Sequence, residues 1–389
     1  MSNSSLRIFL VAGEESGDRL GAPLMRALRS QAGDIEFLGV GGDQMTREGL
    51  ASRFPLHETA IMGFAAVPAK LRSVLARIRQ TADAVVAARP DVLVIIDSPE
   101  FTHRVARRVR RLAPHIPIVD FVSPSVWAWR PGRARAMRKY IDHVLALLPF
   151  EPAAHQRLGG PPCTFVGHPL SERVGVLRPN AEESRRREAP PPILLVMPGS
   201  RRAEIGHMLP LFKQTIELIV PRVGPLDVVI PTVPALAELL REAIRSWTVK
   251  ARVIDDAAEK ETAFRSARAA LVKSGTGTLE LAIAGVPMVA AYRVGAIEAF
   301  VVLKLINVPS VILANLVLGK NVVPEFLQND ATPERLAAPL APLIGDTVER
   351  RDQIGAFKEL DTIMQIGTLI PSERAARVIL ETARQASRA

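Results

Sequence analysis

The stretch Asp91–Phe101, DVLVIIDSPEF, places five apolar residues directly before an aspartate, a proline and a helical pattern. A run of this kind is typical of a parallel strand that is buried on both faces of its sheet. Similar runs occur at LRIFLVAG, IEFLGVGG and IPIVDFVSP, and helical patterns separate them at Leu20–Arg29, Val67–Ala88 and Phe101–Leu112. The first part of the chain is therefore predicted to be an α/β domain with a doubly wound parallel sheet.

A second series of the same kind follows a polar segment. Its strand-like runs are ILLVMPGSR, LDVVIPTV, ARVIDD, AALVKSGTGT and VPMVAAYRV. The segment before it, LRPNAEESRRREAPPP, is charged and rich in proline, which is typical of a linker. The pattern predicts two Rossmann-like domains with a ligand cleft between them. The predicted boundaries are residues 1–172, a linker at 173–192, residues 193–368, and a C-terminal helical segment at 369–389.

Composition limits the class of protein. The chain has 389 residues and a formal net charge of +10, which predicts attraction to a nucleic acid, a sugar nucleotide, a phosphorylated lipid or an acidic bilayer. A single cysteine, Cys163, and an N-terminus without a signal-peptide pattern both predict a cytoplasmic protein. The longest apolar stretch, Ala299–Leu318, contains Lys304 and Pro309, so it is predicted to be a buried helix, a proline break and a buried strand.

Asp97 ends the strand of the opening stretch. A carboxylate at this position is costly to bury unless it is paired or used in chemistry, so Asp97 is predicted to be a general base. The alternative is that Asp97 caps the helix that follows Pro99, and that Glu100 is the acid that faces the ligand.

The segment Ser274–Glu280, SGTGTLE, follows the strand AALVK and contains glycines that permit close backbone approach. Its residues Ser274, Gly275 and Thr276 are predicted to hold a pyrophosphate at a helix N-terminus. Glu280 is predicted to accept hydrogen bonds from ribose hydroxyls; the alternative is an ordinary first-turn acid favoured by the helix dipole. Arg201, in PGSR, is predicted to clamp a phosphate, whereas Arg202 and Glu204 are interpreted as solvated charges.

Two segments of the first domain also follow strands. The turn GEESGD leads into a helix, where Asp18 can cap and backbone amides can face a ligand, with a plain capped turn as the alternative. The segment Val122–Tyr140, VSPSVWAWRPGRARAMRKY, joins two tryptophans to a basic run. Its position after IPIVDF predicts a cleft wall at Ser123–Trp129 and a basic helical flank at Arg130–Lys139. The alternative, nucleic-acid binding with tryptophans stacked on bases, lacks any RRM, KH or helix-turn-helix pattern.

A third segment, MGFAAVPAKLRSVLARIR, combines an apolar stripe with basic residues. It is predicted either to pack on its own sheet or to form a foot on an anionic membrane, extended by Met208, Leu209, Leu211 and Phe212. The residues of this foot are Met62, Phe64, Val67, Lys70, Leu71 and Arg72. The seven histidines show no metal-ligand spacing, so no metal site is predicted.

Taken in order along the chain, these motifs resemble one known family. AGEESGD, GVGGDQM, MGF, IDSPEF, VSPSVWAWR, LPFE, FVGHP, MPGSR, SGTGTLE, MVAAYR and LANLVLGK occur in the order seen in lipid A disaccharide synthases. IDSPEF and SGTGTLE depart slightly from the common forms IDAPDF and SGTAALE, but keep the acids in place. Other GT-B enzymes that handle UDP-amino sugars do not explain VSPSVWAWR.

The resemblance implies a GT-B fold in which the N-terminal domain takes the acceptor, at Ser16, Asp18, Ser125 and Trp127, and the C-terminal domain takes the nucleotide sugar. The last helix, Ser372–Ala386, is expected to cross back to the N-terminal domain. The implied reaction is an inverting transfer, without metal or cofactor, from UDP-2,3-diacylglucosamine to 2,3-diacylglucosamine 1-phosphate. In this reaction Asp97 is the base, and Asn315 lies near UDP. The resemblance also implies attachment to the anionic cytoplasmic face of the inner membrane, and allows a homodimer.

Overall fold

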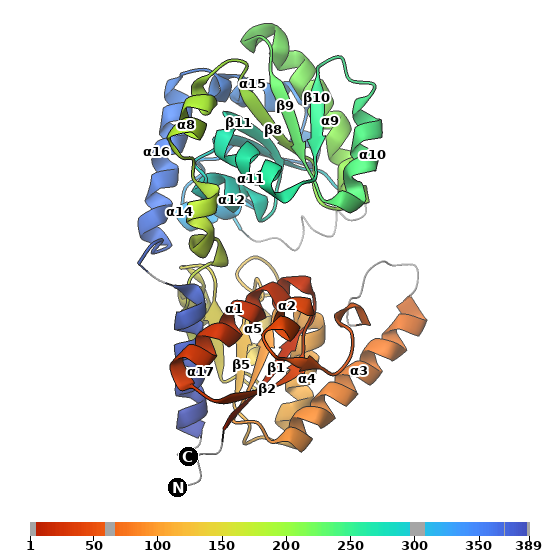
Figure 1. The fold of residues 1–389 in the computed structure, drawn as a ribbon, viewed down its shortest axis with the longest axis vertical. Coiled ribbons are helices and arrows are strands. Elements are labelled where there is room, and N and C mark those ends of the chain that lie inside the picture. The colour runs from red at the N-terminus through yellow and green to blue at the C-terminus, as the bar shows by residue number, and fades with distance from the viewer. Residues whose placement is uncertain (1–4, 59–66, 296–307, 369, 387–389) are drawn as a thin grey trace. The chain divides into compact units, whose positions relative to one another are not determined.

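Strands and helices alternate along almost the whole chain in the computed structural model, which describes residues 5–58, 67–295, 308–368 and 370–386 (Figure 1). The chain divides into two units. Unit 1 comprises Met1–Pro169 and Thr368–Ala389, and unit 2 comprises Leu170–Gly367. The predicted class, two parallel-sheet α/β domains, is confirmed.

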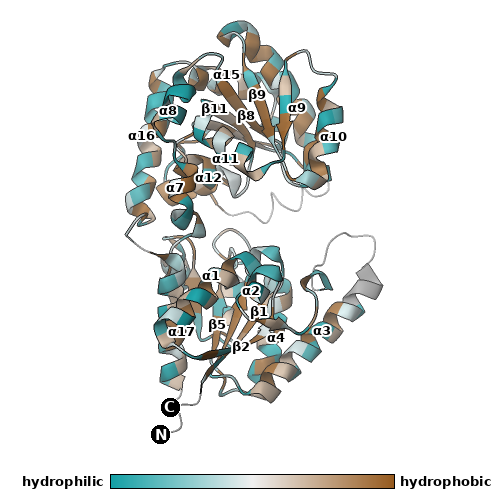
Figure 2. Cartoon of the chain, in the orientation of Figure 1, coloured by the Kyte–Doolittle hydropathy of each residue, from teal (hydrophilic) through white to brown (hydrophobic). Residues whose placement is uncertain are grey.

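Unit 1 holds a seven-stranded parallel sheet with the order β3-β2-β1-β4-β5-β6-β7. The central strands consist of apolar residues that are buried on both faces, as the sequence predicts. Figure 2 shows this apolar character in the strands of both units. The strands are β1 (Leu6–Ala12), β2 (Ile35–Val40), β3 (Ala51–Ser52), β4 (Val92–Ile96), β5 (Ile118–Phe121), β6 (His143–Ala146) and β7 (Cys163–Phe165).

Helices cover both faces of this sheet, so alternate residues of one strand enter different cores. Ile8 and Leu10 of β1 belong to one apolar cluster, whereas Phe9 and Val11 belong to the other. The helices of unit 1 are α1 (Glu15–Ala32), α2 (Asp43–Arg47), α3 (Val67–Ala88), α4 (Pro99–Leu112), α5 (Gly132–Met137), α6 (Glu151–Arg157) and α17 (Pro371–Ala386).

The C-terminal helix α17 belongs to the core of unit 1. Its residues Ala376, Ile379 and Leu380 are buried in the same cluster as Leu24 and Leu28 of α1. The expectation that the last helix crosses back to the N-terminal domain is therefore confirmed.

Unit 2 holds a six-stranded parallel sheet with the order β10-β9-β8-β11-β12-β13. Its strands are β8 (Ile193–Met197), β9 (Asp227–Pro231), β10 (Ala251–Ile254), β11 (Ala269–Lys273), β12 (Met288–Tyr292) and β13 (Glu325–Leu327). Its helices are α7 (Val174–Leu177), α8 (Ala181–Glu188), α9 (Arg202–Val223), α10 (Pro234–Ile244), α11 (Ala257–Ser266), α12 (Gly277–Ile283), α14 (Leu313–Leu318), α15 (Pro333–Ile344) and α16 (Val348–Ile363).

Residues 173–192, expected to be a linker, form part of unit 2 and contain α7 and α8. Asn180 caps α8 in a capping box with Glu183. The buried Arg187 donates hydrogen bonds to the carbonyls of Phe264, Arg265 and Ala284. Such long-range contacts order a segment whose composition alone has little to bury.

The apolar stretch 299–318 differs from its prediction where the structure describes it. The buried strand expected after Pro309 is a helix, α14, with Ala314, Val317 and Leu318 buried. A short apolar run without polar alternation does not distinguish a buried strand from a buried helix. Within the described residues, no helix has the length and apolar character needed to cross a membrane.

Candidate functional site

Each sheet reverses its strand order at one point, and the strand ends at these points carry the main motifs. In unit 1 the reversal lies between β1 and β4, which lead into Gly13 and Asp97. In unit 2 it lies between β8 and β11, which lead into the PGSR segment and Ser274. Open α/β sheets bind ligands in the crevice at such reversals, beyond the carboxyl ends of the strands.

Asp97 adopts a sterically restricted conformation directly after β4. Asp97 and Ser98 both have left-handed backbone dihedrals, with φ of 56° and 47°. The Asp97 carboxylate accepts hydrogen bonds from Ser16 Oγ at 2.6 Å and from the Ser98 amide at 2.7 Å. Ser98, and not Asp97, occupies the N-cap position of α4, so the capping alternative does not account for Asp97. Strained non-glycine residues of this kind concentrate at functional sites.

Gly13 allows the turn after β1 to lie against the turn after β4. A Cβ atom on Gly13 would lie 2.4 Å from Ser98 Cβ, closer than any side chain tolerates. Ser16, at the start of α1, thereby reaches Asp97, which lies 81 residues away in the sequence. The two predicted site residues Ser16 and Asp97 are brought together by this close approach.

Asp18 fixes a neighbouring segment of unit 1. Its buried carboxylate accepts hydrogen bonds from the amides of Gly42, Gln44 and Met45 at 2.8, 2.9 and 3.0 Å, at the start of α2. It therefore joins the GEESGD turn to the GVGGDQM segment and caps α2 rather than its own helix. Ser16 and Asp18 line a cavity of about 1210 Å³ together with Arg19, Arg47 and Arg53.

Trp127 is anchored by a buried acid, Glu151, which ends the LPFE motif. Its Nε1 donates a 3.0 Å hydrogen bond to Glu151 Oε1, and its ring packs edge-on against Phe150 at 5.0 Å. Burial raises the pKa of Glu151 to about 7, and nearby Asp120 contributes in the same direction. Ser125, two residues before Trp127, is exposed.

Glu100, the alternative acid, is occupied by arginines. Arg133 Nη2 donates to its carboxylate at 2.5 Å, and the guanidinium groups of Arg104 and Arg130 lie 3.6 and 3.9 Å away. The hydrogen bond from Arg133 keeps the pKa of Glu100 below its usual value. Arg130 and Arg133 also lie over the ring of Trp129. The basic flank is thus tied to α4, and its helical part is the short α5.

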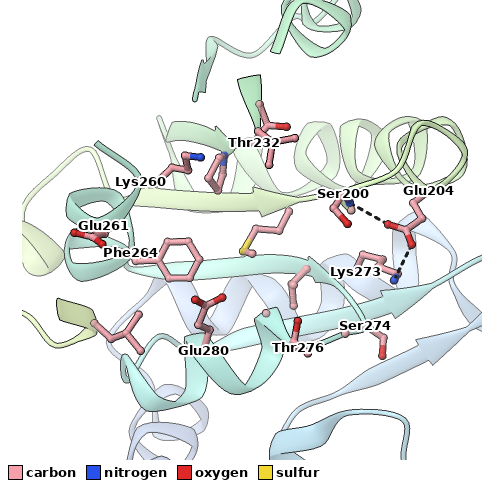
Figure 3. Close-up of a pocket in the computed structure, with 18 of the residues that line it drawn as sticks. Ser200, Glu204, Thr232, Lys260, Glu261, Phe264, Lys273, Ser274, Thr276 and Glu280 are labelled. Carbon is pink, nitrogen blue, oxygen red and sulfur yellow. Dashed lines mark hydrogen bonds and ion pairs between the residues drawn. The ribbon is translucent and has the colours of Figure 1, made fainter. Parts of the chain in front are cut away.

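A cavity of about 430 Å³ lies at the reversal point of unit 2 (Figure 3). Four predicted residues, Ser274, Gly275, Thr276 and Glu280, lie in its wall. Arg173 holds the Glu280 carboxylate at 3.4 Å and that of Glu261 at 3.5 Å, and Glu280 lies in the first turn of α12. The wall also includes Lys260, Phe264, Glu204 and Lys273.

Glu204 and Lys273 form an ion pair that sequence patterns do not indicate. The interpretation of Glu204 as a solvated charge is wrong, because its side chain is only 13% exposed. Its Oε1 lies 3.2 Å from Lys273 Nζ, and its Oε2 accepts a 3.0 Å hydrogen bond from the Ser200 amide. Figure 3 shows these two interactions at one end of the cavity.

Arg201 and Asn315 are placed differently from the other predicted donor-site residues. The Arg201 side chain is 79% exposed and lies 3.7 Å from Glu204. Asn315 is buried, and its amide is occupied by Ser310 Oγ and by the backbone of Val322 and Val323. The Ser274 hydroxyl also bonds within the chain, to the carbonyl of Val311. A direct contact of Asn315 with UDP stays a prediction.

The predicted membrane foot is described only in part. Met62 and Phe64 lie outside the described residues, and Val67, Lys70 and Leu71 are described only as backbone of α3. Arg72 is exposed, Leu75 is 39% exposed, and Val74 and Ile78 are buried in unit 1. The extension of the foot through Met208, Leu209, Leu211 and Phe212 is wrong, because these four side chains are buried in the core of unit 2.

No group of three or more His, Cys, Asp or Glu side chains in the described parts of the chain is arranged to hold a metal ion.

A Rossmann-like parallel sheet in each unit, with one reversal of strand order in each, defines a GT-B-type α/β protein. Solved structures share this fold: MurG of Acinetobacter baumannii has a TM-score of 0.60 at 13% identity and covers 97% of this chain and 99% of its own. A UDP-N-acetylglucosamine 2-epimerase of Rickettsia bellii has a TM-score of 0.61 at 13% identity and covers 99% of both chains. At these identities the likeness is one of fold.

The sequence comparison specifies the family. The family model described as lipid-A-disaccharide synthetase matches residues 8–374. A lipid-A-disaccharide synthase of Nitrobacter hamburgensis is 60% identical over 382 residues, 98% of this chain and 96% of the relative. Another, of Bradyrhizobium diazoefficiens, is 57% identical over 383 residues, 98% of both chains. The chain belongs to the lipid-A-disaccharide synthetase family, as its motifs suggest.

Proposed function

We propose that this chain transfers diacylglucosamine from UDP to the 6-hydroxyl of 2,3-diacylglucosamine 1-phosphate, giving the β-1′,6-linked disaccharide 1-phosphate and UDP. Family membership supports the formation of lipid A disaccharide. The observation that carries the mechanism is the Asp97 carboxylate, held by Ser16 in a strained turn at the strand-order reversal of unit 1.

In this mechanism Asp97 removes the proton of the acceptor 6-hydroxyl while the oxygen attacks the anomeric carbon and UDP leaves from the opposite face. The configuration at the anomeric carbon is thereby inverted. Each Asp97 carboxylate oxygen receives one hydrogen bond from the protein, and each has a further lone pair for the acceptor. Ser16 orients the carboxylate, which keeps the base in place before the acceptor arrives.

The donor is proposed to occupy the unit 2 cavity. The backbone of Ser274, Gly275 and Thr276 lies against the diphosphate, Glu280 accepts from the ribose hydroxyls, and Arg201 adds a cation at the rim. Asn315 supports this region by holding the backbone at Val322 and Val323. Protein amides and cations meet the charge that develops on UDP, so the transfer is proposed to need neither metal nor cofactor.

The acceptor is proposed to lie against unit 1 near Ser16. Asp18 acts there by fixing α2, and Ser125 and Trp127 shape the wall at the end of β5. Because both substrates carry acyl chains, we also propose peripheral attachment to the anionic cytoplasmic face of the inner membrane. The segment from Met62 to Arg72 is its contact. The homodimer that the resemblance allows stays a prediction.

The test is UDP release from UDP-2,3-diacylglucosamine and 2,3-diacylglucosamine 1-phosphate by the purified chain, with and without EDTA. We expect equal rates in both. Asp97→Asn is expected to lower kcat by about 10²- to 10⁴-fold, the usual contribution of a general base, without changing the melting temperature. Asp83→Asn is the matched control, because Asp83 is an exposed carboxylate of α3 paired with Arg108.

No UDP release with short or long acyl chains would refute the proposed reaction. Full activity of Asp97→Asn would refute only the role of the base. Loss of activity in EDTA that Mg²⁺ restores would refute only metal independence.

A further inference from the structure

We propose that Lys273 is the cation that pairs with the diphosphate of the bound nucleotide sugar, and that Glu204 is the carboxylate that positions it and competes for it. This inference rests on the proposed function, because it takes a UDP-sugar as the ligand of the unit 2 cavity. It adds a charged contact that none of the motifs indicates.

Lys273 occupies the position where a diphosphate binds best in a sheet of this type. It is the last residue of β11, beside β8, at the strand-order reversal. Its ammonium group overhangs the glycine loop, because Nζ lies 3.8 Å from where a Cβ on Gly275 would be. The Tyr292 ring, 5.0 Å from Nζ, supports this position. The cation and the glycine loop therefore line the same cavity.

The ion pair with Glu204 holds the ammonium group of Lys273 in place. The Lys273 and Glu204 side chains are only 18% and 13% exposed, so their attraction is screened less than that of a surface pair. Glu204 also has a second cation, Arg201 at 3.7 Å, and a hydrogen bond from the Ser200 amide. When a phosphate takes Lys273, Glu204 keeps both of these partners, so no carboxylate is left buried and unpaired.

The other two cations of the cavity are less suited to this task. Arg173 is already held by the carboxylates of Glu261 and Glu280. Lys260 lies beside Phe264 at the opposite end of the cavity from Lys273 and Glu204, as Figure 3 shows. The helix after the glycine loop, α12, has only seven residues, so its dipole is a limited source of positive potential.

Lys273 also suits the chemistry. Negative charge grows on the diphosphate as the bond to the sugar breaks, and an ammonium group fixed in a partly buried site stabilises that charge.

The experiment is calorimetric titration of UDP and of uridine, without divalent metal, into the wild type, Lys273→Met, Lys273→Arg and Lys260→Met. Uridine lacks the diphosphate, so it reports on the rest of the pocket. We expect Lys273→Met to weaken UDP binding about tenfold or more, because the variant loses a charge-assisted contact. The same variant is expected to weaken uridine binding less than about twofold. Lys273→Arg is expected to restore most of the UDP affinity. Lys260→Met, the matched change in the same cavity, is expected to leave the ratio of the two affinities unchanged.

A further variant, Glu204→Gln, tests the competition. Glutamine can still accept from the Ser200 amide but does not hold the ammonium by charge. We expect UDP to bind severalfold more tightly to Glu204→Gln, with uridine binding unchanged. Weaker binding of UDP to this variant would refute the competing role of Glu204.

The outcomes separate the two levels of inference. A wild type that binds neither UDP nor uridine would refute the proposed donor site and this inference together. A wild type that binds UDP, with Lys273→Met binding it equally well, would refute the assignment of Lys273 alone. Equal weakening of UDP and uridine by Lys273→Met would show a structural role and would also refute it.

Discussion

Three non-glycine residues at the ends of two adjacent strands of unit 1 have left-handed backbone: Asp97, Ser98 and Val122, with φ of 56°, 47° and 87°. Each such backbone conformation raises the free energy of the folded state by about 1–3 kcal/mol, so it persists only where the surrounding structure enforces it. Here the amide of Asp97 donates to the Phe121 carbonyl, and Thr102 Oγ1 donates to the Asp97 carbonyl. These bonds fix the direction of the Asp97 carboxylate independently of any ligand.

The contact of Gly13 with Ser98 can be tested by a double-mutant cycle. Gly13→Ala is expected to destabilise the protein by about 2 kcal/mol and to lower kcat, because the new Cβ forces the two turns apart. Ser98→Gly in the same chain removes the Cβ atom that the new alanine side chain would meet. The second change is expected to restore most of the lost stability and most of the lost kcat. Denaturant unfolding and the UDP-release assay measure the effects. Strict additivity of the two changes would contradict the proposed contact.

Glu151 gives a prediction about pH. Its folded-state pKa of about 7 lies above the usual value of 4.5, so its protonated form is favoured by folding. The stability that it contributes is complete below pH 4.5 and is lost as the pH rises through 7, by on the order of 3 kcal/mol. Glu151→Gln, which can still accept from Trp127, is expected to remove this part of the pH dependence. Unfolding free energies of both proteins between pH 4.5 and 8 measure it, and parallel curves would contradict it.

The local sequence predicts the role of a residue when that role follows from the residue's position on its own helix or strand. Asp97 is such a case, because a carboxylate directly after an apolar strand is conspicuous. The bond from Ser16 to Asp97, the bond from Trp127 to Glu151 and the pair of Glu204 with Lys273 are different. Each joins segments that only the fold brings together, so the sequence around one partner does not identify the other.

The C-terminal helix α17 completes the core of unit 1. Ile379→Ala is expected to lower the unfolding free energy of unit 1 by about 2–5 kcal/mol, because Ile379 is fully buried against α1. Arg377→Ala is the matched control, since Arg377 is exposed on the same helix. Thermal unfolding measures both changes. Equal effects would contradict the packing of α17.

The elements most easily predicted are those whose burial is uniform. The central strands are apolar throughout, and α3 spans the predicted residues Val67–Ala88. The structures of the segments at 173–192 and 310–318 are harder to predict from the sequence, because these segments are held in place by distant partners. Arg187 bonds to carbonyls of α11 and α12, and Asn315 holds a turn seven to eight residues further on.

The net charge of +10 predicts attraction of the whole protein to anionic membranes. Cosedimentation with vesicles that contain anionic phospholipid is expected to exceed that with phosphatidylcholine alone, and to fall as salt rises. The double variant Lys70→Glu, Arg72→Glu is expected to bind these vesicles at least about tenfold more weakly. Lys250→Glu with Arg185→Glu, which changes the net charge equally in unit 2, is the control. An equal loss in both double variants would indicate attraction by net charge without a localised foot.

The return of the chain to unit 1 has a consequence for its biosynthesis. Residues 1–169 leave the ribosome long before Pro371–Ala386, yet the apolar face of α1 needs Ile379 and Leu380 to be covered. The N-terminal unit therefore cannot complete its core until α17 has been synthesised, although domains of nascent chains usually fold in order of synthesis. A chain that stops short of α17, a helix of sixteen residues, would present an uncovered apolar groove to chaperones and proteases.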